Sequence, residues 1–174
     1  MNARYNRKEQ SFTEIYDACV DEVYGFIYVR TGFDSVAAED LTQDVFLAVF
    51  KGLEKFAGKS SERTWVFGIA RNKLNDFYRS RYAYESGGIN EATLISDPKQ
   101  DTYALALKEF ESRVVRDCLE RLSPRCQMVL VMKYLDRYSV KQIANSVNLS
   151  PKAVESLLQR AKTAFIKEYQ TEEL

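Results

Sequence analysis

The chain has 174 residues, of which 45% are hydrophobic and 29% are charged, and its Lys and Arg residues balance its Asp and Glu residues at 25 each. This composition excludes wholesale disorder, and no run approaches the roughly 18 apolar residues of a membrane span, so we expect a cytoplasmic protein. Histidine is absent, which removes the commonest general base and metal ligand; we therefore expect no catalytic residue, metal or cofactor. Few Gly and Pro residues and long stretches of helix formers favour an all-α fold.

Residues 82–106 divide the chain into two helix-rich parts. A Gly-Gly pair and an Asp-Pro pair interrupt helical periodicity there, and a structureless connection of this length is uncommon inside one compact domain. We therefore predict two small helical domains, residues 1–81 and 107–174, joined by a flexible linker; a buried loop within one domain is the alternative. The second part is the basic one, since residues 108–170 carry 12 Lys or Arg against 7 Asp or Glu, whereas residues 1–82 carry 12 of each.

The three cysteines do not indicate a disulfide framework. They are odd in number, and none of the close spacings that hold zinc occurs among them. We expect reduced, partly buried thiols at Cys19, Cys118 and Cys126.

Two helices are predicted at the start of the first domain. Ser11 and Glu14 form a capping-box pattern, which predicts a helix over residues 11–30. Asp34 or Ser35 is expected to cap a second helix, whose apolar residues recur at three- and four-residue steps and form its core stripe. The predicted stripe consists of Leu41, Val45, Ala48, Val49, Leu53 and Phe56.

The opposite side of this second helix combines polar and apolar residues. Leu47 and Phe50 fall on that side of a helical wheel. A solvated helix would show only polar groups there, such as the neighbouring Asp40, Gln43 and Asp44. The pattern indicates a surface for a partner protein. Coverage of Leu47 and Phe50 by another helix of the same domain is an equal alternative on wheel geometry.

A loop over residues 57–61 precedes a third helix, which Ser60 or Ser61 would cap. Its expected inward residues are Val66, Ile69, Ala70, Leu74 and Phe77. The loop and the outward face are basic, amide-rich and aromatic, which suits single-stranded nucleic acid because cations follow phosphates while rings stack on bases. The residues concerned are Lys59, Ser60, Arg63, Trp65, Arg71, Asn72, Asn75 and Arg79. A merely solvated face, with Trp65 in the core, is the alternative.

The second domain is expected to begin with a helix from near Thr102 to Leu122. Its apolar stripe consists of Leu107, Phe110, Val114, Val115, Cys118, Leu119 and Leu122. Ser123 followed by Pro124 then predicts the start of another helix that continues to Leu135.

A succession of caps and turns near the C-terminus is typical of a helix-turn-helix. Ser139 and Gln142 form a second capping box, and Asn148 stands where a left-handed turn residue is needed. Ser150 followed by Pro151 then opens a long final helix. The alternative is a plain helical hairpin without a DNA-binding role.

The final helix has a polar front once its inward face is assigned. Its expected inward residues, Val154, Leu157 and Leu158, would pack against Ile143, Ala144 and Val147 of the preceding helix. The outward set is Lys152, Ala153, Glu155, Ser156, Gln159, Arg160 and Lys162. Lys and Arg would hold phosphates, while Gln and Glu could pair with adenine or cytosine edges in a major groove.

Both parts together resemble the sigma-70 family of RNA polymerase sigma factors, and specifically its small extracytoplasmic-function (ECF) group, which keeps only regions 2 and 4. The segments that carry the resemblance are AAEDLTQDVFLAVF, TWVFGIARNKLNDFYR and LERLSPRCQMVLVMKYLDRYSVKQIANSVNLSPKAVESLLQRAK, in this order. The resemblance implies a non-enzymatic factor that binds core RNA polymerase and directs promoter recognition, DNA melting and transcription initiation. A stand-alone helix-turn-helix transcription regulator is the alternative.

The resemblance also implies roles for the candidate residues. The face from Asp40 to Phe50 would dock on the clamp of the largest polymerase subunit, the loop from Lys59 to Arg63 and the third helix would melt the minus-10 element and hold a flipped base, and the final helix would read the minus-35 element. The implied partners are core polymerase, through its clamp and flap, promoter DNA and an anti-sigma factor that is membrane-bound in many relatives; no small-molecule substrate is implied. Glu155 departs from the family pattern, because many relatives have a basic residue there, and Lys152-Ala153 replaces a frequent Gly-Thr pair.

Overall fold

The computed structural model describes the backbone of residues 2–86 and 113–172 and the side chains of residues 9–82 and 113–171. Every regular element in these ranges is helical, which confirms the predicted all-α class. The chain divides into two compact units, Met1–Leu74 and Asn75–Leu174. No helix among the described residues combines the length and the apolar character that crossing a membrane would take.

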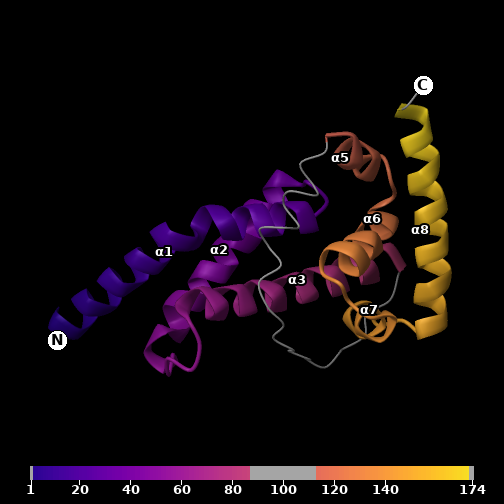
Figure 1. Ribbon diagram of the computed structural model, residues 1–174. Coiled ribbons are helices and arrows are strands. Elements are labelled where there is room, and N and C mark those ends of the chain that lie inside the picture. The colour runs from indigo at the N-terminus through magenta and orange to yellow at the C-terminus, as the bar shows by residue number, and fades with distance from the viewer. Residues whose placement is uncertain (1, 87–112, 173–174) are drawn as a thin grey trace. The chain divides into compact units, whose positions relative to one another are not determined.

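The first unit contains two helices that lie side by side and the start of a third (Figure 1). The elements are α1 (Asn2–Arg30), α2 (Ser35–Gly52), the 3₁₀ turn η1 (Leu53–Lys55) and α3 (Glu62–Ser86), which continues past the boundary between the two units. The helix α3 therefore also runs past residue 81, where the first domain was expected to end. Most of the predicted linker, residues 82–106, lies outside the described residues.

One of the three predicted helix starts in this unit is wrong. The helix α1 begins at Asn2, so Ser11 lies within it and does not cap it. The hydroxyl of Thr13 donates to the carbonyl of Glu9 at 2.9 Å, which is a contact made inside a continuous helix. The residues before Ser11 include no Gly or Pro that would stop a helix. The second start is confirmed, because Asp34 caps α2 by accepting from the amide of Ala37 at 3.0 Å.

The core of the first unit uses a face of α2 that differs in part from the predicted stripe. Val45 and Val49 are fully buried as expected, but Leu41, Ala48, Leu53 and Phe56 are only half-buried. The remaining buried residues of α2 are Ala38, Thr42 and Phe46. The α-helix also ends at Gly52, four residues before Phe56. In α3, Val66, Ala70 and Leu74 are buried as expected together with Phe67 and Tyr78, whereas Ile69 and Phe77 are half-buried.

The second unit is built around a long C-terminal helix that packs on three shorter ones (Figure 1). The described elements are α5 (Arg113–Glu120), α6 (Pro124–Leu130), the π-helical turn η2 (Val131–Leu135), α7 (Val140–Val147) and α8 (Pro151–Glu172). Cys118, Leu119 and Leu122 are buried as expected, while Val114 is exposed and Val115 half-buried. The predicted start of this domain near Thr102, with Leu107 and Phe110, lies outside the described residues.

The helix-turn-helix geometry of the second unit agrees with the sequence in each local detail. Ser139 and Gln142 form a reciprocal capping box, with contacts of 3.2 and 2.8 Å. Asn148 adopts the left-handed conformation at φ 53° and ψ 49°, and Ser150 accepts from the amide of Ala153 at 3.2 Å. The six predicted packing residues, Ile143, Ala144, Val147, Val154, Leu157 and Leu158, are all buried. These short-range features fix how α7 and α8 meet.

Candidate nucleic-acid and polymerase interfaces

The outer face of α2 presents two strongly exposed apolar side chains among polar ones, Val36 at the start of the helix and Leu47 further along it. Leu47 is 55% exposed, although it lies on a helix whose other side carries the buried residues Val45 and Val49. Asp40, Gln43 and Asp44 are exposed beside it. The carboxylate of Asp44 also accepts from the ammonium of Lys73 on α3 at 3.2 Å, which ties this face to the third helix.

Phe50 differs from Leu47, because an aromatic cluster from α1 partly covers it. The ring of Phe12 meets the ring of Phe50 edge to face at a centroid distance of 5.2 Å, and Tyr16 meets Phe46 at 4.8 Å. Phe50 is consequently half-buried. Each of the two alternatives drawn from the helical wheel therefore holds for one residue. Leu47 faces solvent, whereas α1 covers part of Phe50.

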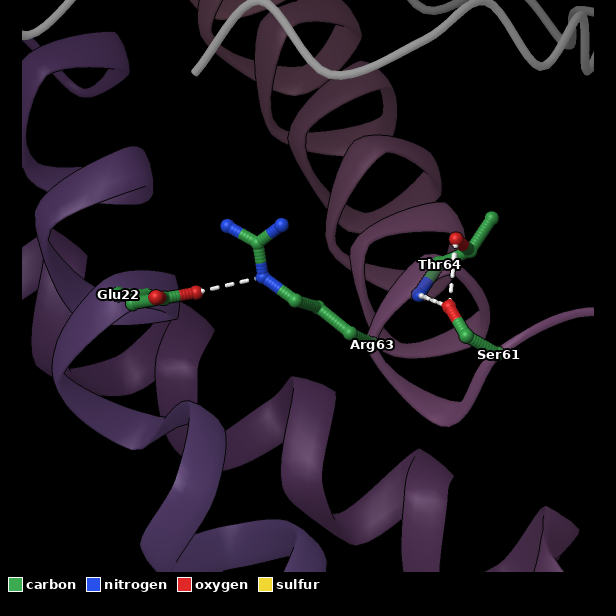
Figure 2. A network of polar contacts seen from close by, with 4 residues as sticks. All are labelled: Glu22, Ser61, Arg63 and Thr64. Carbon is green, nitrogen blue, oxygen red and sulfur yellow. Dashed lines mark hydrogen bonds and ion pairs between the residues drawn. The ribbon is translucent and has the colours of Figure 1, made fainter. Parts of the chain in front are cut away.

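Ser61, one of the two serines expected to cap α3, does cap it from the end of the preceding loop. Its hydroxyl accepts from the amide of Thr64 at 3.2 Å (Figure 2). Its carbonyl accepts from the amide of Trp65 at 3.0 Å. The hydroxyls of Ser61 and Thr64 lie 2.8 Å apart. Lys59 and Ser60 remain exposed on the loop. This cap fixes the direction in which α3 leaves the loop.

Arg63, in the first turn of α3, is held by a carboxylate from α1. Its Nε donates to Oε2 of Glu22 at 2.8 Å, and the two side chains are 41% and 44% exposed. The guanidinium carbon also lies 5.3 Å from the centroid of the Phe67 ring. In Figure 2 the contact with Glu22 meets Nε, and the two terminal nitrogens of Arg63 lie beyond it at the end of the side chain. Sequence reasoning missed Glu22, because nothing local to the first helix indicates which loop it faces.

One face of the Trp65 ring packs against the ring of Phe56. Trp65 is half-buried and stacks on Phe56 at a centroid distance of 4.6 Å and an interplanar angle of 24°. A Cβ atom at Gly52 would lie 3.1 Å from Cζ2 of the indole, so the absence of a side chain at Gly52 allows this close approach. The ring thus joins the end of α2 to the start of α3.

The remaining candidates on α3 differ in accessibility. Asn72 is exposed, whereas Arg71, Asn75 and Arg79 are half-buried. The guanidinium of Arg71 lies 6.0 Å from the centroid of the Phe26 ring, and Arg79 donates to Asp76 at 3.2 Å. This face is therefore basic, but two of its guanidinium groups already interact with a ring or a carboxylate of the same chain.

The front of α8 is more open. Six of its seven candidates are exposed, and Ala153 is half-buried. The ammonium of Lys162 lies 5.6 Å from the centroid of the Tyr134 ring, and Tyr134 is itself 54% exposed on η2. Sequence reasoning missed Tyr134, whose place on the surface depends on the π-helical turn. The front of α8 combines cations, one carboxylate, one hydroxyl and one amide within the first turns of a long helix.

The cysteines do not form disulfides, as expected. Cys19 and Cys118 are buried, and Cys126 is half-buried. Burial, with a smaller contribution from the nearby Glu22 carboxylate, raises the pKa of the Cys19 thiol above its ordinary value. The thiol of Cys19 therefore stays protonated at neutral pH, which makes it a poor nucleophile. No group of three or more potential metal ligands occurs within the part of the chain that the structure describes.

Comparison with known proteins identifies two matched regions. Residues 15–83 match the family model for Sigma-70 region 2, and residues 112–165 match that for Sigma-70, region 4. The chain is 24% identical over 162 residues to the ECF RNA polymerase sigma factor SigX of Bacillus subtilis, which covers 87% of this chain and 80% of the relative. It is 27% identical over 157 residues to the RNA polymerase sigma factor YlaC of the same organism, which covers 90% of each.

Among solved structures, the chain is similar to the sigma factor RpoE of Bartonella quintana, determined in complex with the anti-sigma factor NepR. The identity is 17%, the TM-score is 0.47, and the match covers 92% of this chain and 98% of that one. The two family-model matches fall one on each of the helical regions that carry the candidate surfaces. The chain belongs to the sigma-70 family, as a member of the ECF group of RNA polymerase sigma factors.

Proposed function

We propose that the outer face of α2 binds core RNA polymerase, that the Lys59 to Arg63 loop and α3 melt the minus-10 element, and that the front of α8 reads the minus-35 element. The observation that carries this proposal is the exposure of Leu47 within a polar helix face. An apolar side chain that becomes buried at the centre of an interface, inside a polar rim, matches the general anatomy of protein interfaces. The clamp of the largest polymerase subunit is the expected partner of this face.

The polymerase face is centred on Leu47. Phe50 already contacts Phe12, so it offers less new surface to a partner than Leu47 does. Asp40, Gln43 and Asp44 would form the polar rim, which sets orientation and excludes other partners more than it adds affinity. Leu47 is accordingly the residue whose truncation should matter most.

The minus-10 surface supplies both charge and stacking groups. Lys59, Arg63 and Arg71 would follow phosphates, while Asn72 and Asn75 could bond to base edges. The surface also includes Ser60, Trp65 and Arg79. Trp65 would support the loop, because its ring packs on Phe56. Extracting a base costs a few kcal/mol, and contacts of about 1 to 3 kcal/mol per stacked base could offset that cost.

The minus-35 surface lies on the first turns of α8. Lys152, Arg160 and Lys162 would hold phosphates, and Gln159 and Glu155 could pair with adenine and cytosine edges. Ala153 and Ser156 are small enough to let the helix approach a groove. Exposure of six of the seven residues supports this assignment.

The two binding regions would be separate domains joined by a linker. The proposed division is residues 1–81, 82–106 and 107–174. The family-model matches support it, because one ends at residue 83 and the other begins at residue 112. A factor of this kind works without catalysis of its own, in the cytoplasm with core polymerase and promoter DNA. It would contact the polymerase clamp with the first domain and the flap with the second, and an anti-sigma protein that covers these faces would hold it inactive.

Core-binding affinity of a Leu47→Ala variant tests the proposal. We expect affinity for purified core polymerase, measured by fluorescence anisotropy of the labelled chain, to fall about tenfold, because truncating a central apolar anchor removes a hot spot. Ile166→Ala is the matched control: Ile166 is also 55% exposed, and it lies beyond the region 4 match, which ends at residue 165.

The control variant should bind core polymerase within about twofold of the wild type, and circular dichroism should show unchanged helical content for both variants. Equal affinity of the wild type and Leu47→Ala would contradict the proposed face. Phe50→Ala is a poorer test, because it also removes the contact with Phe12 and disturbs the aromatic cluster.

A further inference from the structure

We propose that Glu22 is a positioning residue for promoter melting, which holds the Arg63 guanidinium so that its terminal edge is presented to the minus-10 strand. The inference rests on the proposed function of the loop before α3. Glu22 lies on α1, outside the loop and the helix that would touch DNA. It would therefore act through Arg63 and not by its own contact with the promoter.

The geometry of the contact determines which part of the guanidinium Glu22 holds. Glu22 accepts from Nε, the nitrogen on the side of the group, at 2.8 Å. The two terminal nitrogens lie beyond Nε, at the end of the side chain (Figure 2). Because these two nitrogens and Nε form a rigid planar fork, fixing Nε also fixes the direction of the terminal edge.

A second contact limits the remaining freedom of the side chain. The guanidinium carbon lies 5.3 Å from the centroid of the Phe67 ring, within the range of a cation–π interaction. Phe67 is buried, so surrounding side chains restrict the movement of its ring. One contact from α1 and one from the next turn of α3 thus restrict a long side chain that would otherwise sample many rotamers. A preorganised Arg loses less conformational entropy when it binds a phosphate or a base.

The charge of Glu22 is not what the proposed role requires. A carboxylate next to a DNA-binding surface repels phosphates, so charge alone would weaken binding. The amide oxygen of Gln can accept from Nε in the same way as the carboxylate. Glu22→Gln therefore retains the positioning contact without the charge, whereas Glu22→Ala removes both.

The ion pair could instead be a purely structural tie between α1 and α3. Both side chains are more than two fifths exposed, and exposed pairs of this kind add little to stability. A structural role would lower stability and polymerase binding together. The positioning role changes the opening of DNA and leaves polymerase binding as it was.

The test measures open-complex formation by holoenzyme, assembled from core polymerase and the full chain, on a promoter that the wild-type factor transcribes. Permanganate reactivity of unpaired thymines reports melting. We expect Glu22→Ala and Arg63→Ala each to reduce melting about tenfold, and the double variant to be no worse than Arg63→Ala. Glu22→Gln should retain melting within about threefold of the wild type. Core affinity should be unchanged in all four variants.

Different failures have different meanings. Normal melting by Glu22→Ala, with melting reduced in Arg63→Ala, overturns the positioning role and leaves the proposed function of the loop intact. Normal melting by Arg63→Ala overturns the proposed contact of Arg63 with the promoter. A loss with Glu22→Gln as large as with Glu22→Ala, or a parallel loss of core affinity, also overturns the positioning role.

Discussion

The two candidate DNA-binding surfaces differ in how far they are involved in folding. On α8, six of seven candidate residues are exposed, and their removal would leave the packing of Val154, Leu157 and Leu158 untouched. On α3 and its loop, five of eight candidates are half-buried, and four of these five contact rings or carboxylates of the same chain: Arg63, Trp65, Arg71 and Arg79. The proposed DNA contacts are thus separate from core packing on α8 and combined with it on α3.

This difference suits the two proposed tasks. Reading a duplex groove requires a set of side chains on a rigid helix, which a separately packed α8 provides. Holding an unstacked strand requires groups that are already fixed when the base leaves the duplex, because every side chain that must be ordered lowers the net gain. Partial burial on α3 would hold these groups in place before the base leaves the duplex. The same burial means that substitutions there also affect stability.

Trp65→Ala should have the largest effect on stability. The ring stacks on Phe56 and approaches Gly52 closely, so its loss should lower the free energy of unfolding of the first unit by about 2 kcal/mol. Urea unfolding followed by far-ultraviolet circular dichroism measures the change. Tyr134→Ala is the matched aromatic control in the second unit; since Tyr134 is 54% exposed, its effect should stay within about 0.5 kcal/mol. Equal losses of stability in the two variants would contradict the conclusion that aromatic residues near the α3 surface contribute more to folding than those near the α8 surface.

Ser139→Ala should have an intermediate effect. It removes the capping box of α7 and should cost about 1 kcal/mol, seen as a lower Tm. Ser11→Ala is its control, since Ser11 has the same sequence pattern but lies inside α1. We expect a change within about 0.5 kcal/mol there, because Ala is the better helix former. A comparable loss for Ser11→Ala would mean that α1 begins near residue 11 after all.

Replacing both Lys152 and Arg160 by Ala should have the smallest effect on stability, within about 0.5 kcal/mol. Their loss should instead reduce the slope of log affinity against log salt by about two when holoenzyme binds a duplex that carries the minus-35 element. Lys167→Ala, on the same helix but beyond the region 4 match, should leave the slope unchanged. An unchanged slope for the double variant would exclude phosphate contacts at Lys152 and Arg160.

The sequence predicts the second unit better than the first because the features of the helix-turn-helix are local. The caps at Ser139 and Ser150 and the left-handed residue Asn148 depend on neighbours within four positions. Such patterns can mislead only when the flanking residues are also helical. Ser11 is that case: the pattern with Glu14 is present, yet the helix has already begun at Asn2.

The features that sequence reasoning missed in the first unit all depend on contacts between elements. The pairing of Glu22 with Arg63, of Phe12 with Phe50 and of Trp65 with Phe56 joins residues from different helices or turns. A helical wheel shows which side of a helix a residue occupies, but not which element covers it. The wheel therefore grouped Leu47 and Phe50 together, although α1 covers part of one and leaves the other exposed.

Run-off transcription with purified core polymerase tests most directly whether this chain directs initiation through the face centred on Leu47. Genomic fragments of the source organism serve as templates, and sequencing of the transcripts locates their start sites. We expect the wild-type chain to produce transcripts from a small set of discrete start sites, and Leu47→Ala to yield far fewer from the same sites. Transcripts no different from those of core polymerase alone, together with specific duplex binding by the chain without polymerase, would contradict the assignment and favour a stand-alone regulator.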